Sequence, residues 1–137
     1  NLNDKWYTTF WSHTFDNWDQ ITPPYENGET RMQVLYLDYS RFMNQMILDC
    51  YLNEAGAIRS VKPDDFVTTN MMSAQYINID CRAWAKHIDV IAWDCYPQPY
   101  HSDIAESAFR HECMRAAKDG QPFLFTLFRP FKENLQT

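Results

Sequence analysis

Apolar residues recur with helical spacing over residues 38–61, which predicts the longest helix of the chain. One stripe of this helix collects four apolar side chains, those of Phe42, Met46, Cys50 and Ile58. Ile47 and Tyr51 lie beside that stripe. We expect the helix to end at Val61, because Pro63 follows shortly and proline cannot continue a helix.

Two shorter helices show the same periodicity. The first is marked by five apolar positions, Ile77, Cys81, Trp84, Ala85 and Ile88. The second is marked by Ile104, Ala108, Phe109 and Cys113. The pair Asp119-Gly120 closes this second helix, since glycine is typical of the position just after a helix.

Three short apolar runs, rich in β-branched and aromatic residues, predict buried strands at 66–71, 90–93 and 123–128. Strands and helices therefore alternate along this part of the chain. Continuous apolar strands separated by helices are typical of parallel pairing with both faces of the sheet covered. The pattern thus predicts an α/β fold.

Two architectures fit this order of elements: a small doubly wound sheet, or part of a (β/α)8 barrel. A complete barrel needs roughly 250 residues, so a chain of 137 residues holds only about half of one. Ahead of these elements, residues 6–21 are rich in aromatic side chains. The polar stretch from Pro23-Pro24 to Thr30 predicts a loop.

Composition excludes several classes of protein. A length of 137 residues predicts one domain at most. The formal net charge of −6 argues against a nucleic-acid-binding protein, which needs clustered Lys and Arg. A hydrophobic content of 45% excludes disorder, and no apolar run approaches the ~20 residues of a membrane span. The first residues include neither an initiator Met nor a signal peptide, so we expect a segment of a longer protein.

The spacing of the cysteines and the small number of glycines argue against a metal site and a phosphate-binding loop. The four Cys, at 50, 81, 95 and 113, are too far apart for a metal knuckle, and they fall in apolar patterns where Cys acts as a small hydrophobic residue. We therefore expect free thiols, no metal, and a reducing, cytoplasmic compartment. Three Gly are too few for a phosphate-binding loop, so no nucleotide cofactor is expected.

The carboxyl ends of the strands are where an α/β protein places its chemistry. Asn70 and Asp94 lie at two of these ends, and Asp94 is the only carboxylate there. Asp94 could also cap the segment after it or pair with a neighbouring strand. Trp11 and Tyr96 are open to two interpretations, as core residues or as walls on which a sugar ring stacks.

Two other candidate residues are interpreted as structural. His111 lies in the middle of a predicted helix, which favours a packing role. Cys95 has no His at an informative spacing, so a thiol nucleophile is not expected there.

Six sequence motifs occur in order along the chain. They are TFWS at 9–12 with NWDQI at 17–21 and PP at 23–24, LNDKW at 2–6, LDYSRF at 37–42, VTTNMM at 67–72, DVIAWDCYP at 89–97, and HECMR at 111–115 with GQPFL at 120–124. Together they resemble the motifs of glycoside hydrolase family 42 β-galactosidases. The resemblance covers nearly the whole chain.

This resemblance implies a catalytic (β/α)8 barrel that hydrolyses terminal non-reducing β-D-galactosides with retention, using one Glu as acid/base and one as nucleophile. It implies that residues 1–137 are a fragment of that domain, covering roughly strands five to seven with their helices. It also implies that the sugar contacts Trp11, Tyr96, Asp94 and Asn70, without a metal or other cofactor.

The chain departs from the family at residue 127. The family has its nucleophilic Glu there, whereas this sequence has Leu127, and the acid/base Glu belongs to a segment upstream of Asn1. We therefore expect the isolated chain to be inactive. The alternatives are a non-catalytic carbohydrate-binding remnant and a structural α/β domain. A partial barrel exposes sheet edges, so we expect pairing with the remainder of the barrel or self-association.

Overall fold

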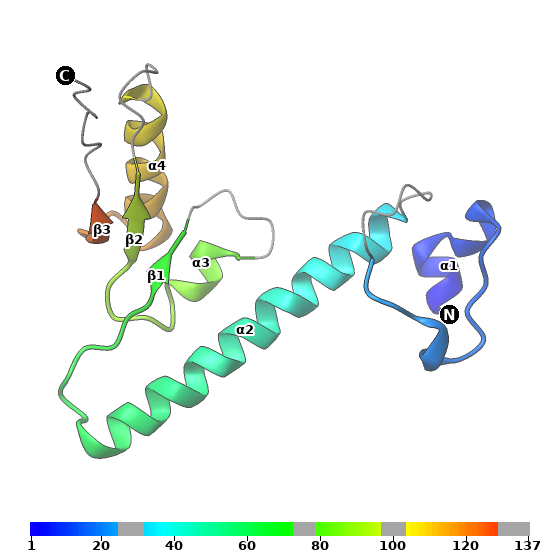
Figure 1. Ribbon diagram of the computed structural model, residues 1–137, viewed down its shortest axis with the longest axis horizontal. Coiled ribbons are helices and arrows are strands. Elements are labelled where there is room, and N and C mark those ends of the chain that lie inside the picture. The colour runs from blue at the N-terminus through cyan, green and yellow to red at the C-terminus, as the bar shows by residue number, and fades with distance from the viewer. Residues whose placement is uncertain (25–31, 73–78, 97–103, 129–137) are drawn as a thin grey trace, which may run out of the picture. The chain divides into compact units, whose positions relative to one another are not determined.

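The computed structural model of the chain describes residues 1–24, 32–72, 79–96 and 104–128 (Figure 1). The chain divides into two compact units, Asn1–Ile47 and Leu48–Thr137. Each unit buries its own residues, with Trp6 and Leu35 in the first and Trp93 and Met114 in the second. Within the described ranges, no helix combines the length and apolar character needed to cross a bilayer.

The aromatic-rich start of the chain folds into three short helices, α1 (Leu2–Trp6), η1 (Thr8–Trp11) and η2 (Trp18–Gln20). The side-chain amide of Asn3 joins α1 to η1 and to Phe15, which precedes η2. Its Oδ1 accepts from Thr8 Oγ1 at 2.7 Å and from the Phe15 backbone N–H at 2.9 Å, while its Nδ2 donates to the Phe15 carbonyl at 2.8 Å. The predicted loop that follows extends to Thr30, and its residues from 25 on lie outside the described ranges.

Asp38 ties α1 to the helix that carries it, α2 (Gln33–Val61). Its Oδ2 accepts from the Trp6 indole Nε1 at 3.0 Å and lies 2.9 Å from Lys5 Nζ. Its Oδ1 accepts from Arg41 Nη1 at 3.0 Å. These donors favour the charged carboxylate. Led by the Lys5 and Trp6 hydrogen bonds, they lower the pKa of Asp38 from 3.8 to about 2.

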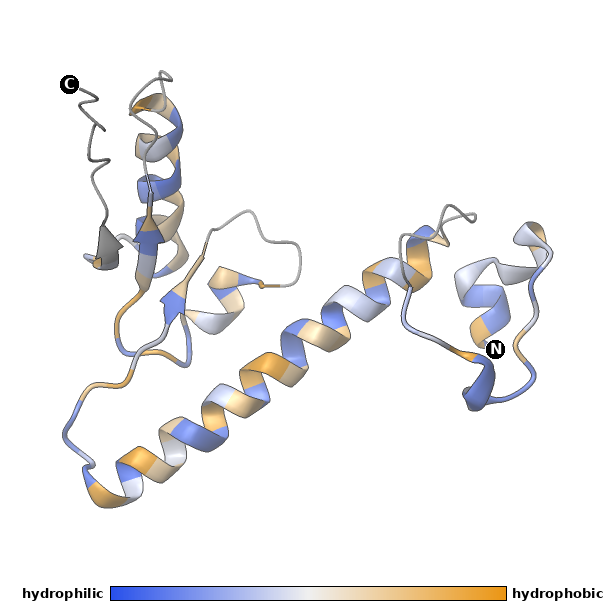
Figure 2. Cartoon of the chain, in the orientation of Figure 1, coloured by the Kyte–Doolittle hydropathy of each residue, from blue (hydrophilic) through white to orange (hydrophobic). Residues whose placement is uncertain are grey.

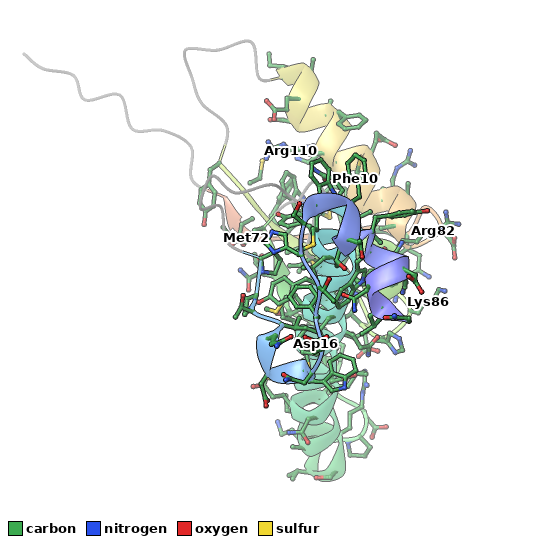
Figure 3. All side chains as sticks on the ribbon, turned by 90° about the vertical axis from the view of Figure 1, so that its right-hand side faces the viewer. Phe10, Asp16, Met72, Arg82, Lys86 and Arg110 are labelled. Atoms are coloured by element: carbon green, nitrogen blue, oxygen red, sulfur yellow. The ribbon has the colours of Figure 1, made fainter. Side chains whose placement is uncertain are left out.

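The lowered pKa of Asp38 predicts how the first unit responds to acid. Because the folded pKa lies below the unfolded value, the carboxylate stabilises this unit above about pH 4, and that stabilisation is lost as the pH falls through about 2. We expect the Asp38 carboxyl carbon to titrate with a midpoint near pH 2 by NMR. Asp38→Asn should reduce the acid sensitivity of Trp6 fluorescence, whereas Asp16→Asn, at an exposed carboxylate labelled in Figure 3, should not. A midpoint near 4 for Asp38 would contradict the network.

The predicted end of α2 is confirmed and its predicted start is wrong. The helix ends at Val61, just before Pro63, but it begins at Gln33 rather than at 38. The stripe of Phe42, Met46, Cys50 and Ile58 is exposed within this chain. The buried positions are instead Leu48, Tyr51 and Ala55, spaced three and four residues apart. Apolar and polar residues alternate along the α2 ribbon in Figure 2, and its apolar residues include both buried and exposed positions.

The three strands form one sheet in the order β1-β2-β3, and their parallel pairing agrees with the prediction. Their bounds are β1 (Asn70–Met71), β2 (Ala92–Cys95) and β3 (Leu124–Phe128). β3 agrees with the prediction, whereas β1 is much shorter than 66–71. β2 lies two residues later than predicted, so Asp94 and Cys95 belong to the strand itself. The ladder extends only as far as a neighbouring strand supplies hydrogen-bonding partners.

Two helices flank the strands of the second unit, α3 (Cys81–Trp84) and α4 (Ile104–Ala117). The predicted helix over 77–88 is therefore only four residues long, and Ile77 lies outside the described residues. Asp80 begins α3 by accepting from the Arg82 and Ala83 backbone N–H groups at 3.1 and 3.0 Å. α4 ends as predicted, since Gly120 follows it with a φ of +82°, in the left-handed region.

The core of the second unit lies between the sheet and its helices. It joins residues of α2, α3, α4, the strands and the segments between them. They are Leu48, Tyr51, Ala55, Val67, Met71, Cys81, Trp84, Ala85, Ile88, Ile91, Trp93, Cys95 and Met114. Residues 71, 93 and 95 occupy one face of the strands, because side chains alternate along a strand. This face is therefore the one covered by helices.

Asp89 fastens the turn between α3 and β2 to two other segments. It accepts from the Val67 backbone N–H at 2.7 Å and from Arg59 Nη2 at 2.8 and 2.9 Å. The Val67 hydrogen bond, followed by the Arg59 guanidinium, lowers the pKa of Asp89. These contacts fix the last turn of α2 and the entry to β1 at the amino end of the sheet.

Candidate functional site

A three-residue polar cluster lies on the face of the sheet opposite the helices. Its centre is Asp94 on β2, which is 3% exposed. Asp94 Oδ2 accepts from Asn70 Nδ2 on β1 at 2.9 Å, and Asp94 Oδ1 accepts from Thr126 Oγ1 on β3 at 2.7 Å. One carboxylate thus joins all three strands through side chains, and both of its oxygens have a donor.

The alternation of side chains along the strands explains why these residues meet. Asn70 pairs in register with Ala92, so its side chain is on the same face as Ala92 and Asp94. Met71 and Trp93, which also pair, face the helices. A buried carboxylate needs hydrogen-bond donors, and the neighbouring strands supply them.

An irregularity in β3 brings Thr126 to this cluster. Trp93 pairs with Phe125 and Asp94 pairs with Leu127, so β3 has one residue more than β2 between these pairs. The extra residue is Thr126, which the ladder skips. Such a bulge redirects a side chain that a regular strand would place differently. Here it leaves the Thr126 hydroxyl on Asp94, while the Leu127 backbone takes the position opposite Asp94.

The structure brings together two of the four predicted site residues. Asn70 and Asp94 are hydrogen-bonded, which agrees with the interpretation of Asp94 as a partner of a neighbouring strand. Tyr96 directly follows β2 and is 46% exposed. Trp11 belongs to the first unit, where it is 39% exposed and packs edge-to-face on Phe10 with the ring centroids 4.9 Å apart. Figure 3 labels Phe10 and also Met72, the exposed residue that follows β1.

Thr126 is a member of the cluster that sequence reasoning missed. It is the one hydroxyl-bearing residue in the otherwise apolar run 123–128. Threonine is common in strands, so its presence in this run gave no specific signal of a polar cluster. The bulge that places Thr126 gave no signal either, because a bulge depends on the register with the neighbouring strand.

The structure gives Cys95 a His neighbour that its sequence spacing did not reveal. Cys95 Sγ lies 3.8 Å from His111 Nε2, since α4 packs its middle against the end of β2. The His111 ring stacks on Phe123 and contacts Trp93 edge-on, with centroids 5.5 and 5.2 Å away, which agrees with the predicted packing role. Burial raises the pKa of the Cys95 thiol. A raised pKa disfavours the reactive thiolate, which is in line with the expectation that Cys95 is not a nucleophile.

No metal centre is present among the described residues, which hold no group of three or more His, Cys, Asp or Glu suited to an ion. The four cysteines are free thiols. Burial also raises the pKa of Cys81, which favours its neutral form. The chemistry available at the carboxyl ends of the three strands is therefore hydrogen bonding by Asn70, Asp94 and Thr126, beside the exposed ring of Tyr96.

A family model described as beta-galactosidase, that of glycoside hydrolase family 42, matches residues 1–136. The beta-galactosidase BgaP of Planococcus sp. (strain L4) is 40% identical over 141 residues, covering 98% of this chain and 21% of the relative. The crystal structure of a beta-galactosidase from Bacillus circulans sp. alkalophilus superposes with a TM-score of 0.76 at 39% identity, covering 89% of this chain and 19% of that one. A beta-galactosidase from Rahnella sp. R3 gives a TM-score of 0.80 at 34% identity, covering 90% and 19%. The chain thus spans about a fifth of the length of the relatives that it matches.

Proposed function

The chain belongs to the glycoside hydrolase family 42 β-galactosidases, and from this premise we propose that it forms part of a retaining enzyme that hydrolyses terminal non-reducing β-D-galactosides. The observation that carries the proposal is the family match over residues 1–136. Relatives named beta-galactosidase cover 98% of the chain and support it. The α/β arrangement of the second unit is compatible with it.

We place the chain in the catalytic barrel of that enzyme, with β1, β2 and β3 as strands five to seven. Two observations support this placement. The strands are parallel and adjacent in sequence order, which is how strands follow one another around a barrel. Helices separate them and, among the described residues, pack on the face of Met71, Trp93 and Cys95, while the opposite face carries Asn70, Asp94 and Thr126. In a barrel, that opposite face is the interior.

Within the enzyme, we propose that the residues of this chain bind the sugar and do not cleave the glycosidic bond. A retaining glycosidase needs two carboxyl groups ~5 Å apart. At the carboxyl ends of the described strands Asp94 is the only carboxylate, and both its oxygens already accept hydrogen bonds. By the motif resemblance, Leu127 takes the position of the family's nucleophilic Glu. Asn70, held by Asp94, then contacts a hydroxyl group of the sugar, and the exposed ring of Tyr96 offers a surface for its apolar face. Trp11 of the first unit is proposed separately as a second ring that contacts the sugar.

The first test is an assay of the isolated chain with o-nitrophenyl β-D-galactoside. We expect no release of nitrophenol above the uncatalysed rate, because the proposal assigns neither the nucleophile nor the acid/base Glu to this chain. The matched control is a longer polypeptide that includes the upstream barrel strands and carries Leu127→Glu, which should hydrolyse the substrate. Turnover by the isolated chain would show that its chemistry resides elsewhere in these residues.

The alternative function is a carbohydrate-binding remnant without any catalytic partner, which Leu127 favours. Galactose binding distinguishes it from a structural domain. Saturable quenching of tryptophan fluorescence by galactose in the isolated chain supports a binding role. Unchanged fluorescence at high sugar concentration, together with unchanged NMR spectra, favours a structural domain.

We also propose that the sheet edges of this chain pair with the remainder of the barrel. Among the described residues, β1 and β3 are the outer strands, and no strand pairs with their outer edges. Leu124 and Phe125 of β3 are exposed as well. Unpaired edges recruit other strands, so the isolated chain should self-associate. Sedimentation velocity should show species larger than 16.3 kDa that increase with concentration. A monomer over the whole concentration range would contradict the partial barrel.

A further inference from the structure

The Asn70 amide is held in one orientation by its neighbour. Asn70 Nδ2 donates to Asp94 Oδ2 at 2.9 Å, and a carboxylate oxygen only accepts. The nitrogen end of the amide must therefore face Asp94, and the carbonyl end is turned away from it. A flipped amide would set two acceptor oxygens against each other.

Asp94 is itself held from the other side. Its Oδ1 accepts from Thr126 Oγ1 at 2.7 Å, and its side chain is buried within β2. Two strands thus fix the carboxylate, and the carboxylate fixes Asn70. Asn70, by contrast, is exposed as the first residue of the two-residue strand β1. Its Oδ1 accepts no hydrogen bond from the residues that the structure describes. The cluster therefore presents an acceptor oxygen to solvent, on a rigid base.

We propose that Asp94 is a positioning residue that fixes the Asn70 amide, and that Asn70 Oδ1 accepts a hydrogen bond from one hydroxyl group of the sugar. This inference rests on the proposed sugar-binding function and adds the direction of the hydrogen bond. The site then selects a ligand group that donates. A group that only accepts, such as fluorine, leaves Oδ1 unpaired.

The ligand half of the proposal is tested with the 137-residue chain, galactose and the four galactoses in which one hydroxyl at C2, C3, C4 or C6 is replaced by fluorine. A fluorine atom is similar in size to a hydroxyl group but cannot donate a hydrogen bond. We expect one of these sugars to bind about fivefold more weakly than galactose in NMR titrations, the effect of one net hydrogen bond. In Asn70→Ala that difference should disappear, while the effects of the other three fluorine positions persist. Asn53→Ala, at an exposed position on α2, is the control and should retain all four effects.

The positioning half is tested by a spectroscopic signature. In the native chain, the two side-chain amide protons of Asn70 should be well separated, with one shifted downfield by the Asp94 carboxylate. In Asp94→Asn that shift should be lost, because two amides can pair in either orientation. Thr126→Val should broaden the Asn70 signals, since Asp94 loses one of its donors, and Thr126→Ser should restore them. A role in stability alone would not give this rescue.

The outcomes separate the two proposals. If galactose does not bind, the sugar-binding function is wrong and the ligand half falls with it, whereas the amide spectra still decide the role of Asp94. If galactose binds and Asn70→Ala leaves every fluorine effect unchanged, Asn70 is not the contact. If the Asn70 amide signals are the same in Asp94→Asn as in the native chain, Asp94 does not position it.

Discussion

Trp93→Ala is expected to lower the free energy of unfolding of the second unit by about 3–5 kcal/mol. Trp93 is 1% exposed and is the largest fully buried side chain of the chain's described part. Its ring lies 5.2 Å from that of His111 and 6.1 Å from that of Phe125, so it joins β2 to both α4 and β3. Truncation leaves a cavity that these neighbours fill only in part.

The loss on truncating Trp93 is one of packing. Its indole Nε1 is buried without a hydrogen-bond partner among the described residues, so the substitution removes no polar contact there. Urea denaturation followed by far-UV circular dichroism measures the effect. The matched control is Trp18→Ala, since Trp18 is 75% exposed and its loss should stay within about 0.5 kcal/mol. Equal midpoints for the two variants would show that the sheet does not pack on α4 as described.

Met114→Ala is expected to lower the free energy of unfolding by about 2–5 kcal/mol. Met114 is the buried residue of α4, with 0% exposure, and it belongs to the core with Trp84 and Trp93. The same substitution favours the helix slightly by intrinsic propensity, so the destabilisation reports the lost packing.

Met46→Ala is the matched control for Met114, because Met46 also lies in a helix but is 51% exposed. Its denaturation midpoint should be unchanged or slightly raised. Hydrogen exchange adds a local readout, since amides of α4 should lose protection in Met114→Ala and keep it in Met46→Ala. Unchanged protection of α4 in Met114→Ala would contradict the placement of α4 on the core.

The two helix ends that were predicted correctly depend on local chemistry. Pro63 stops α2 just after Val61, and Gly120 takes the left-handed conformation after α4. Both residues act through their own backbone geometry, which a sequence shows directly. The start of α2 carries no comparable local signal at Gln33, and the side of α2 that is buried depends on what packs there.

Strand limits were predicted less well, because they depend on other strands. β1 is reduced to Asn70–Met71, while Val67 before it is buried without forming a ladder. The polar Thr68 is held by its side chain, whose hydroxyl donates to the Val90 carbonyl. The shift of β2 to Ala92–Cys95 follows from the same cause, since both neighbours set its pairs.

The part of the candidate site that depends only on strand order and direction was predicted from the sequence. Parallel strands end at one edge, so Asn70 and Asp94 could be expected together, and they are. Thr126 and the Cys95–His111 contact could not be inferred from spacing. The first depends on the bulge in β3, and the second depends on how α4 packs 16 residues further along the chain.

The bulge in β3 makes one position of this sheet tolerant of a change in length. Thr126 takes no part in the backbone pairs, so deleting it would leave Phe125 opposite Trp93 and Leu127 opposite Asp94. Elsewhere in a paired strand, the loss of one residue turns every following side chain to the other face. Natural variants of this segment could therefore differ by a single residue here and keep the sheet intact, at the cost of the hydroxyl donor to Asp94.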